Sequence, residues 1–349
     1  TRNSQFGAIT NAGLIRGASS AIVVDGAEIQ GLLNTGSIVG VSSNGVRVAF
    51  GGLISGNVTN NLGYISGIDN AGSMAGIHNN TGVIANGINN TGTISDLALP
   101  VKMYHGTLTG GFTNSGLIQA TNSYAAVEFY ASAVTGGFDN LGGTILGGLG
   151  GSAAFALHSG TTINGVVSNS GLISGQKGLS LTASFITGGI TNSGSIVGTS
   201  GAGVVVAVNT TLTGLNNTGY ISSVSNAGFI ANISNLGGTV AGGITNAGLI
   251  YNASGTGITA SGSTLTVFND STGTIAGLFG GDINISNSGL IALQQYSGTN
   301  TVTGSHVNAS ISGNYVQAAA GTLQIGVTGT AGSGTTSGNF SILNASGSA

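Results

Sequence analysis

Apolar or small residues alternate with polar ones along most of this chain, in short runs that are bounded by glycine and asparagine. In the segment 192–198, Asn, Gly, Ile and Gly occupy one set of alternate positions, and Ser, Ser and Val occupy the other. Because alternate residues of a strand face the same side, the first set is expected to face inward and the second outward. Gly, Thr, Ser, Asn, Ile and Val are abundant and oppose helix formation. The pattern therefore predicts β structure throughout.

The alternating segments are copies of one motif, Asn-x-Gly-x-Ile. With small variations, the motif begins at Asn11, Asn34, Asn61, Asn70, Asn80, Asn90, Asn114, Asn140, Asn169, Asn192, Asn217, Asn226, Asn235, Asn246, Asn269 and Asn287. Steps between copies range from 9 to 29 residues, and the short steps add up to 29 both from Asn61 to Asn90 and from Asn217 to Asn246. We therefore predict coils of 23–29 residues with three faces, in blocks of three turns that start near residues 11, 90, 169 and 246.

Such a repeat predicts an all-β solenoid of about 12 turns, because one turn cannot bury its apolar face without its neighbours. Stacking places Ile over Ile, and it places Asn over Asn so that the side-chain amides bond along the axis. Asn and Gly are expected at the corners because both tolerate a positive φ. The asparagines predicted to form this structural ladder are Asn11, Asn34, Asn61, Asn90, Asn114, Asn140, Asn169, Asn192, Asn217 and Asn246.

Composition narrows the function. Only 4% of the 349 residues are charged and 40% are hydrophobic, a combination that argues against a disordered chain. Five Lys and Arg in total are too few for a nucleic-acid surface. The chain has no cysteine, and therefore no disulfide and no thiolate metal site. No segment has the roughly 20 apolar residues of a membrane helix, so direct membrane insertion of this segment is not expected.

The sequence predicts no catalytic residue, no metal ligand and no cofactor. Polysaccharide-active enzymes also use β-helices, but they need two carboxylates that face each other across a groove. Asp69 and Asp139 are the nearest approach to such a pair, and we expect them to lie about three turns, or roughly 14 Å, apart. The four histidines share no metal-ligand spacing. An enzyme of this class stays an alternative only if loops of adjacent turns bring two acids together.

Two surface features are candidates for contacts with other molecules. Tyr124, Glu128 and Tyr130 share one face of a strand whose other face carries Ala, Val and Phe, so they form a candidate surface contact. Outward Ser and Thr residues suggest comparison with ice-binding solenoids. Those proteins use a regular threonine array, whereas the outward positions here vary in type.

The repeat over residues 8–295, followed by the segment 312–327 (Ser-Gly-Asn-Tyr-Val-Gln-Ala-Ala-Ala-Gly-Thr-Leu-Gln-Ile-Gly-Val), resembles the passenger domains of bacterial autotransporters. The resemblance implies a right-handed parallel β-helix, export to the bacterial surface, and a role in adhesion, aggregation or biofilm formation. It also implies a continuous solenoid over residues 1–307 and a closing segment over 308–349 that seeds folding. No barrel sequence follows, and the inserted domains of passenger enzymes are absent from this sequence.

The expected role is that of an extracellular structural or adhesive protein, whose partner is a glycan or protein on a host or bacterial surface. The alternative is a filament subunit that stacks on copies of itself, end to end or side by side. Open solenoid ends expose unpaired strand edges, and a low charge removes the usual barrier to association. Electron microscopy separates the two roles, because a filament subunit forms ordered fibres and a passenger domain remains as dispersed rods.

Overall fold

The computed structural model describes residues 4–122, 124–148, 150, 152–296, 302–306, 308–325 and 342–346. These residues form stacked parallel strands without a helix, in a β-solenoid of about 11 turns that matches a right-handed parallel β-helix. The predicted fold class is confirmed. The chain divides into two compact units, unit 1 (Thr1–Gly203) and unit 2 (Val204–Ala349).

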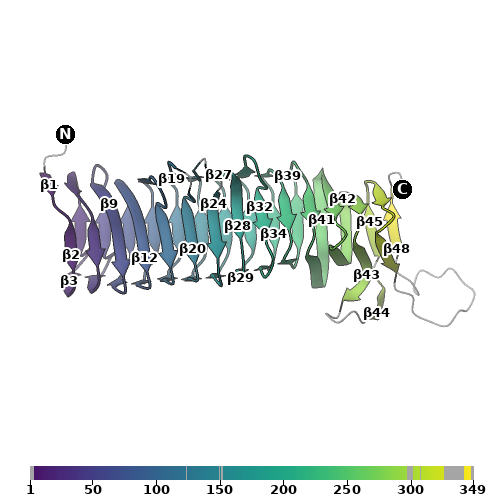
Figure 1. Cartoon of the computed structure of the whole chain (residues 1–349), viewed down its shortest axis with the longest axis horizontal. Helices are drawn as coiled ribbons and strands as arrows, with labels where there is room; N and C mark the ends of the chain where they lie inside the picture. The colour runs from purple at the N-terminus through teal and green to yellow at the C-terminus, as the bar shows by residue number, and fades with distance from the viewer. Residues whose placement is uncertain are drawn as a thin grey trace, which may run out of the picture. The chain divides into compact units, whose positions relative to one another are not determined.

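Each coil of unit 1 has up to four short strands, which pair in parallel with their counterparts in the neighbouring coils (Figure 1). We call these stacks columns a to d. Column a contains β2 (Ile9–Asn11), β6 (Leu32–Asn34), the ends of β9 (Leu53–Asn61) and β12 (Ser73–Asn80), β16 (Val101–Tyr104), β20 (Val127–Tyr130), β24 (Ala153–His158) and β28 (Lys177–Leu181). Column b contains β3 (Leu14–Gly17), β7 (Ser37–Gly40), β10 (Tyr64–Ile65), β13 (Val83–Ile84), β17 (Thr107–Thr109), β21 (Ala133–Thr135), β25 (Thr162–Asn164) and β29 (Phe185–Ile186).

The other two columns of unit 1 follow the same rule of one strand per coil. Column c contains β4 (Ile22–Val24), β8 (Val46–Val48), β11 (Ile68–Asn70), β14 (Ile88–Asn90), β18 (Phe112–Asn114), β22 (Phe138–Asn140), β26 (Val167–Asn169) and β30 (Ile190–Asn192). Column d contains β1 (Ser4–Phe6), β5 (Ala27–Ile29), the starts of β9 and β12, β15 (Thr93–Asp96), β19 (Leu117–Ala120), β23 (Thr144–Leu146), β27 (Leu172–Gly175) and β31 (Ser195–Gly198).

The core of unit 1 consists of aliphatic side chains that lie over one another from coil to coil. In column d, Ile94 pairs in register with Ile118, and the series continues through Ile145 and Ile173 to Ile196, all fully buried. The predicted stacking of Ile over Ile is confirmed. Parallel strands that are covered on their inner face need such apolar residues at alternate positions, which is the alternation seen in the sequence.

The Asn-x-Gly corners join column a to column b and column c to column d. Their glycines are required by the neighbouring coil, not by the dihedral angle. A Cβ on Gly116 would lie 2.0 Å from the carbonyl oxygen of Gly92, and one on Gly36 would lie 2.1 Å from that of Gly13. Neither glycine is among the residues with positive φ, and neither are the ladder asparagines. The expectation that Asn and Gly occupy these corners for their positive φ is therefore wrong here.

Unit 2 repeats this organisation with longer strands. Its shorter strands are β32 (Val204–Val206), β33 (Thr211–Leu212), β34 (Leu215–Asn217), β35 (Tyr220–Ile221), β36 (Val224–Asn226), β37 (Phe229–Ile230), β38 (Ile233–Leu236), β39 (Thr239–Val240) and β40 (Ile244–Asn246). They pair in parallel with one another or with β41 (Leu249–Asn269), and β41 pairs with β42 (Thr274–Asn287). The strands that follow are β43 (Leu290–Tyr296), β44 (Val302–His306), β45 (Asn308–Ile311), β46 (Tyr315–Gln317), β47 (Thr322–Ile325) and β48 (Ile342–Ala345).

The predicted closing segment, 308–349, continues the stacking where it is described. β46 pairs with β42, β47 with β43, and β48 with β45, all in parallel. Residues 326–341 and 347–349 of this segment lie outside the described part of the chain. A folding-seed role for the segment, and a domain boundary at 307/308, stay predictions.

Candidate binding surface

Nine of the ten asparagines predicted to form the ladder are buried, and they bond along the axis as expected. The bonds have a fixed pattern. Asn114 Nδ2 donates to Asn140 Oδ1 at 2.8 Å, and also to the carbonyl oxygens of Gly116 and Leu117. Each asparagine thus holds its own corner and the next coil with one amide, which satisfies polar groups that would otherwise be costly to bury.

Asn61 is the exception, and its predicted place in the ladder is wrong by one residue. Asn61 is exposed, whereas Asn60 is buried and accepts a 2.8 Å hydrogen bond from Asn34. The corner here has one additional residue between Asn and Gly, namely Leu62 with a φ of 60°. The same longer corner begins at Asn79, where the motif search had found Asn80.

The asparagines form several ladders, because each coil has two Asn corners. Column a contains the series Asn11, Asn34, Asn60 and Asn79. Column c contains the series Asn70, Asn90, Asn114, Asn140, Asn169 and Asn192. Unit 2 contains the pair Asn217 and Asn235 and the series Asn226, Asn246, Asn269 and Asn287, which ends on Gln317. The expected single column is thus divided.

Short coils explain the shift between ladders. Asn60 pairs with Asn79, 19 residues later, and Asn70 pairs with Asn90, 20 residues later. The span from Asn61 to Asn90 is therefore about one and a half coils, not one turn of 29 residues. As a result, the block that starts at Asn11 lies half a coil out of step with the one that starts at Asn90.

In column a of unit 1 the ladder stops after Asn79, and apolar side chains take its place. Met103 pairs with Asn79, and Phe129, Leu157 and Leu181 follow in register. Phe129 packs against Phe155 with ring centroids 5.5 Å apart, within a cluster that also contains Phe112 and Phe138. These coils have an entirely apolar interior behind column a.

The predicted contact residues lie on the outer side of this same part of column a. Glu128 and Tyr130 face outward from β20, while Val127 and Phe129 face the core, as the alternation predicts. Tyr124 lies before the strand and is 49% exposed. The structure therefore places Glu128 and Tyr130 on one sheet face and puts Tyr124 in the connection that leads to it.

The outer face of β16, in the coil before, completes a cluster that the sequence analysis missed. Tyr104 pairs with Tyr130 in register, and their rings stack with centroids 5.1 Å apart. His105 packs edge-on against both rings, at 4.5 Å and 5.8 Å. Lys102 Nζ lies 5.5 Å from the centre of the Tyr104 ring, at cation–π distance.

We call this cluster the aromatic patch; it consists of Lys102, Tyr104, His105, Glu128, Tyr130 and His158, which pairs with Tyr130 on the far side. His105 occupies a left-handed corner position, with a φ of 51°. The equivalent corners of the next two coils carry Ala131 and Ser159 in the same conformation, so the imidazole is not required by the turn. A register search between consecutive strands would have found Tyr104 opposite Tyr130.

The acidic residues do not form a catalytic pair. Asp69, Asn89, Thr113 and Asp139 follow one another in register in column c, so the two acids are three coils apart as expected. Asp69 instead accepts a hydrogen bond from Asn89 and lies 3.7 Å from Arg47. Within the described residues, no three His, Asp or Glu side chains are placed to hold a metal ion.

No protein-family model, curated protein or solved structure matches this chain. Among the residues that the structure describes, no helix is long and apolar enough to span a membrane.

Proposed function

We propose that this chain is an extracellular adhesive protein, in which the solenoid is a stalk that presents the aromatic patch to a glycan or protein on a cell surface. The observation that carries the proposal is the stacked pair Tyr104 and Tyr130, with His105 and Lys102 against it, on a chain with 4% charged residues. Aromatic and ionisable side chains are scarce in this sequence, and here they are gathered on two adjacent strands.

The patch has the chemistry of a binding surface. Tyrosine offers a large apolar face and a hydroxyl, with few rotatable bonds to immobilise on binding. Tyr104 is 41% exposed, so part of its ring is available to a partner. The neighbouring imidazole, ammonium and carboxylate groups supply donors and acceptors around the rings.

The scaffold beneath the patch is suited to this role. β16 and β20 are parts of a continuous parallel column, and the Phe cluster fills the space behind them. A surface on packed strands keeps its geometry better than one on loops, and this lowers the entropy cost of binding.

Adhesion of coated particles tests the proposal. Beads that carry the purified chain are incubated with bacterial and epithelial cells, and bound beads are counted. We expect the Tyr104→Ala/Tyr130→Ala variant to bind about tenfold less than the parent, because buried aromatic anchors dominate interface energies. Tyr64→Ala/Tyr220→Ala is the matched control, since these tyrosines are 37% and 39% exposed and lie outside the patch.

Two results contradict the proposal. The first is binding of parent beads that does not exceed binding of uncoated beads on any cell type. The second is equal loss of binding in the patch variant and in the control variant, which indicates a general surface effect. Circular dichroism of each variant confirms that the fold is retained.

A further inference from the structure

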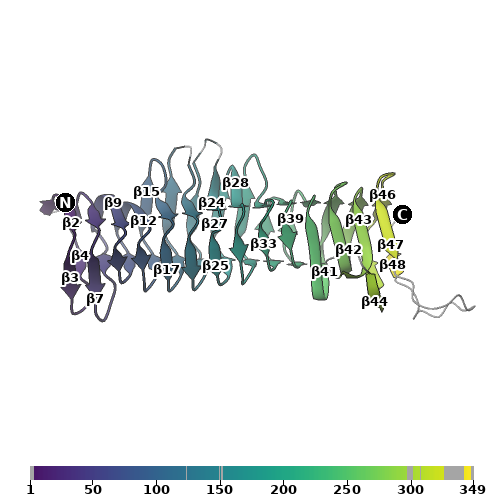
Figure 2. The ribbon, with the colours of Figure 1, turned by 60° about the horizontal axis from the view of Figure 1, so that its bottom comes forward.

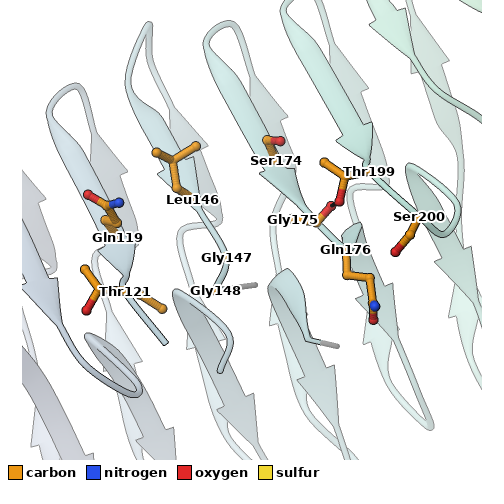
Figure 3. A pocket seen from close by; sticks show the side chains of 11 residues that line it. Gln119, Thr121, Leu146, Gly147, Gly148, Ser174, Gly175, Gln176, Thr199 and Ser200 are labelled. Atoms are coloured by element: carbon orange, nitrogen blue, oxygen red, sulfur yellow. Dashed lines mark hydrogen bonds between the residues drawn. The ribbon is translucent and has the colours of Figure 1, made fainter. Parts of the chain in front are cut away.

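A second surface of unit 1, separate from the aromatic patch, contains a groove of about 380 Å³ across four coils. Its floor includes Gln119, Leu146 and Ser174, which pair in register on β19, β23 and β27 of column d. Figure 3 shows these side chains on successive strands, with Gln176 and Ser200 on the connections that follow. These connections lead from column d to column a, and Figure 2 shows them extending beyond the strands in this part of unit 1.

Backbone groups at the edge of the groove are already paired along the solenoid. Gly147 N–H donates to Ser174 O at 2.9 Å, Thr199 N–H donates to Gly175 O at 2.8 Å, and Gly148 N–H donates to Tyr124 O at 2.9 Å. A peptide that binds by strand addition needs a free strand edge. These amides do not provide one, so recognition in the groove depends on side chains.

The side chains of the groove are polar without being charged. Gln119, Ser174 and Gln176 are half-buried, and their amide and hydroxyl groups have no hydrogen-bond partner within the described part of the chain. Leu146 lies between Gln119 and Ser174 in the register and adds an apolar surface. None of the eleven lining residues is ionisable.

We propose that this groove binds an uncharged linear polysaccharide whose chain crosses successive coils. A pyranose ring has hydroxyls at its rim, which suit the Gln and Ser side chains, and an apolar C–H face, which suits Leu146. Coils advance by about 4.8 Å, a distance similar to the advance of one sugar residue in an extended glycan. Lining groups on successive coils thus meet successive sugars.

The absence of charge selects the class of glycan. An anionic polysaccharide needs cationic or backbone N–H partners, and those amides that are described here are already engaged. The site also differs from the aromatic patch in residues and in strand column. Its occupancy is therefore independent of the adhesive role proposed above.

Affinity electrophoresis in native gels tests the proposal with three neutral probes, mixed-linkage β-glucan, galactomannan and dextran. Alginate is the anionic probe, and an uncharged Ser/Asn-rich peptide serves as a soluble competitor. We expect at least one neutral polysaccharide to retard the full chain. Gln119→Ala/Gln176→Ala should weaken that retardation about tenfold, because two amide contacts are lost. Gln30→Ala, a change at an exposed glutamine elsewhere, is the matched control.

A second variant, Ser174→Trp, fills the groove and should also abolish retardation. Equal retardation of the parent, the double variant and the Trp variant overturns the proposal, as does retardation by alginate alone or by none of the neutral probes. Release of the chain by the peptide competitor assigns the groove to a peptide instead. If Tyr104→Ala/Tyr130→Ala abolishes retardation and the groove variants do not, the glycan binds at the patch.

Discussion

At the scale of single residues, a buried asparagine has three tasks in this fold. The amide of Asn60 donates to Asn79 Oδ1 at 2.9 Å and to the carbonyl oxygens of Gly63 and Val83, and its oxygen accepts from Asn34. No other side chain of this size offers two donors and an acceptor in one plane. Where the ladder begins, the pattern leaves a visible defect. Asn70 Oδ1 is buried without a donor, because Val48 occupies the preceding position.

The neighbours Asn60 and Asn61 allow a direct test of the ladder. We expect Asn60→Ala to lower the free energy of unfolding by about 1–3 kcal/mol, since it leaves buried donors and acceptors unpaired. Asn61→Ala should change it by no more than about 0.5 kcal/mol, because Asn61 is exposed. Equilibrium denaturation followed by circular dichroism measures both. If the two substitutions cost the same, the ladder does not contribute as described.

At the scale of the corner, the glycine of Asn-x-Gly is set by the distance between coils. A Cβ on Gly116 meets the carbonyl of Gly92, which belongs to the backbone of the preceding coil and cannot rotate away. The longer corners solve a different problem. They place a left-handed residue before the glycine, such as Leu62, Thr81 or Gly142.

This distinction predicts unequal costs for two Gly→Ala substitutions. Gly116→Ala should destabilise the chain by about 3 kcal/mol, at the upper end of overpacking effects. Gly142→Ala should cost about 1 kcal/mol, because a Cβ there has open space and only the positive φ of 69° is unfavourable. Thermal and denaturant unfolding of the two variants gives the comparison. A larger cost at Gly142 would show that dihedral strain, not contact between coils, determines the choice of glycine.

Much of the fold could be predicted from the alternation and the motif, because both report the inner face of a strand directly. The register could not. The pair Asn60-Asn61 fits the motif at its second residue, and only the additional left-handed residue at Leu62 shows that the first one is buried. Likewise, Tyr104 and Tyr130 lie 26 residues apart in coils of irregular length, so their stacking depends on the pairing of β16 with β20. The residues of the groove have no motif at all.

At the scale of the whole molecule, the scarcity of charge means that burial and backbone pairing hold the coils together. The chain has 13 charged residues, five basic and eight acidic, and a formal net charge of −3. The Arg47–Asp69 pair is separated by 3.7 Å and is partly exposed, a type of pair that contributes little to stability.

Stability should therefore depend weakly on ionic strength. Between roughly 0.01 M and 1 M sodium chloride the Debye length falls from about 30 Å to about 3 Å, so exposed charge interactions are removed. We expect the free energy of unfolding to change by less than about 1 kcal/mol over this range. Sodium sulfate is the positive control, because its exclusion from the protein surface strengthens the burial of apolar groups and should raise stability. A clear loss of stability in sodium chloride contradicts this view, and it would assign a structural role to the charged side chains of the aromatic patch, Lys102 and Glu128, which face each other in register on β16 and β20.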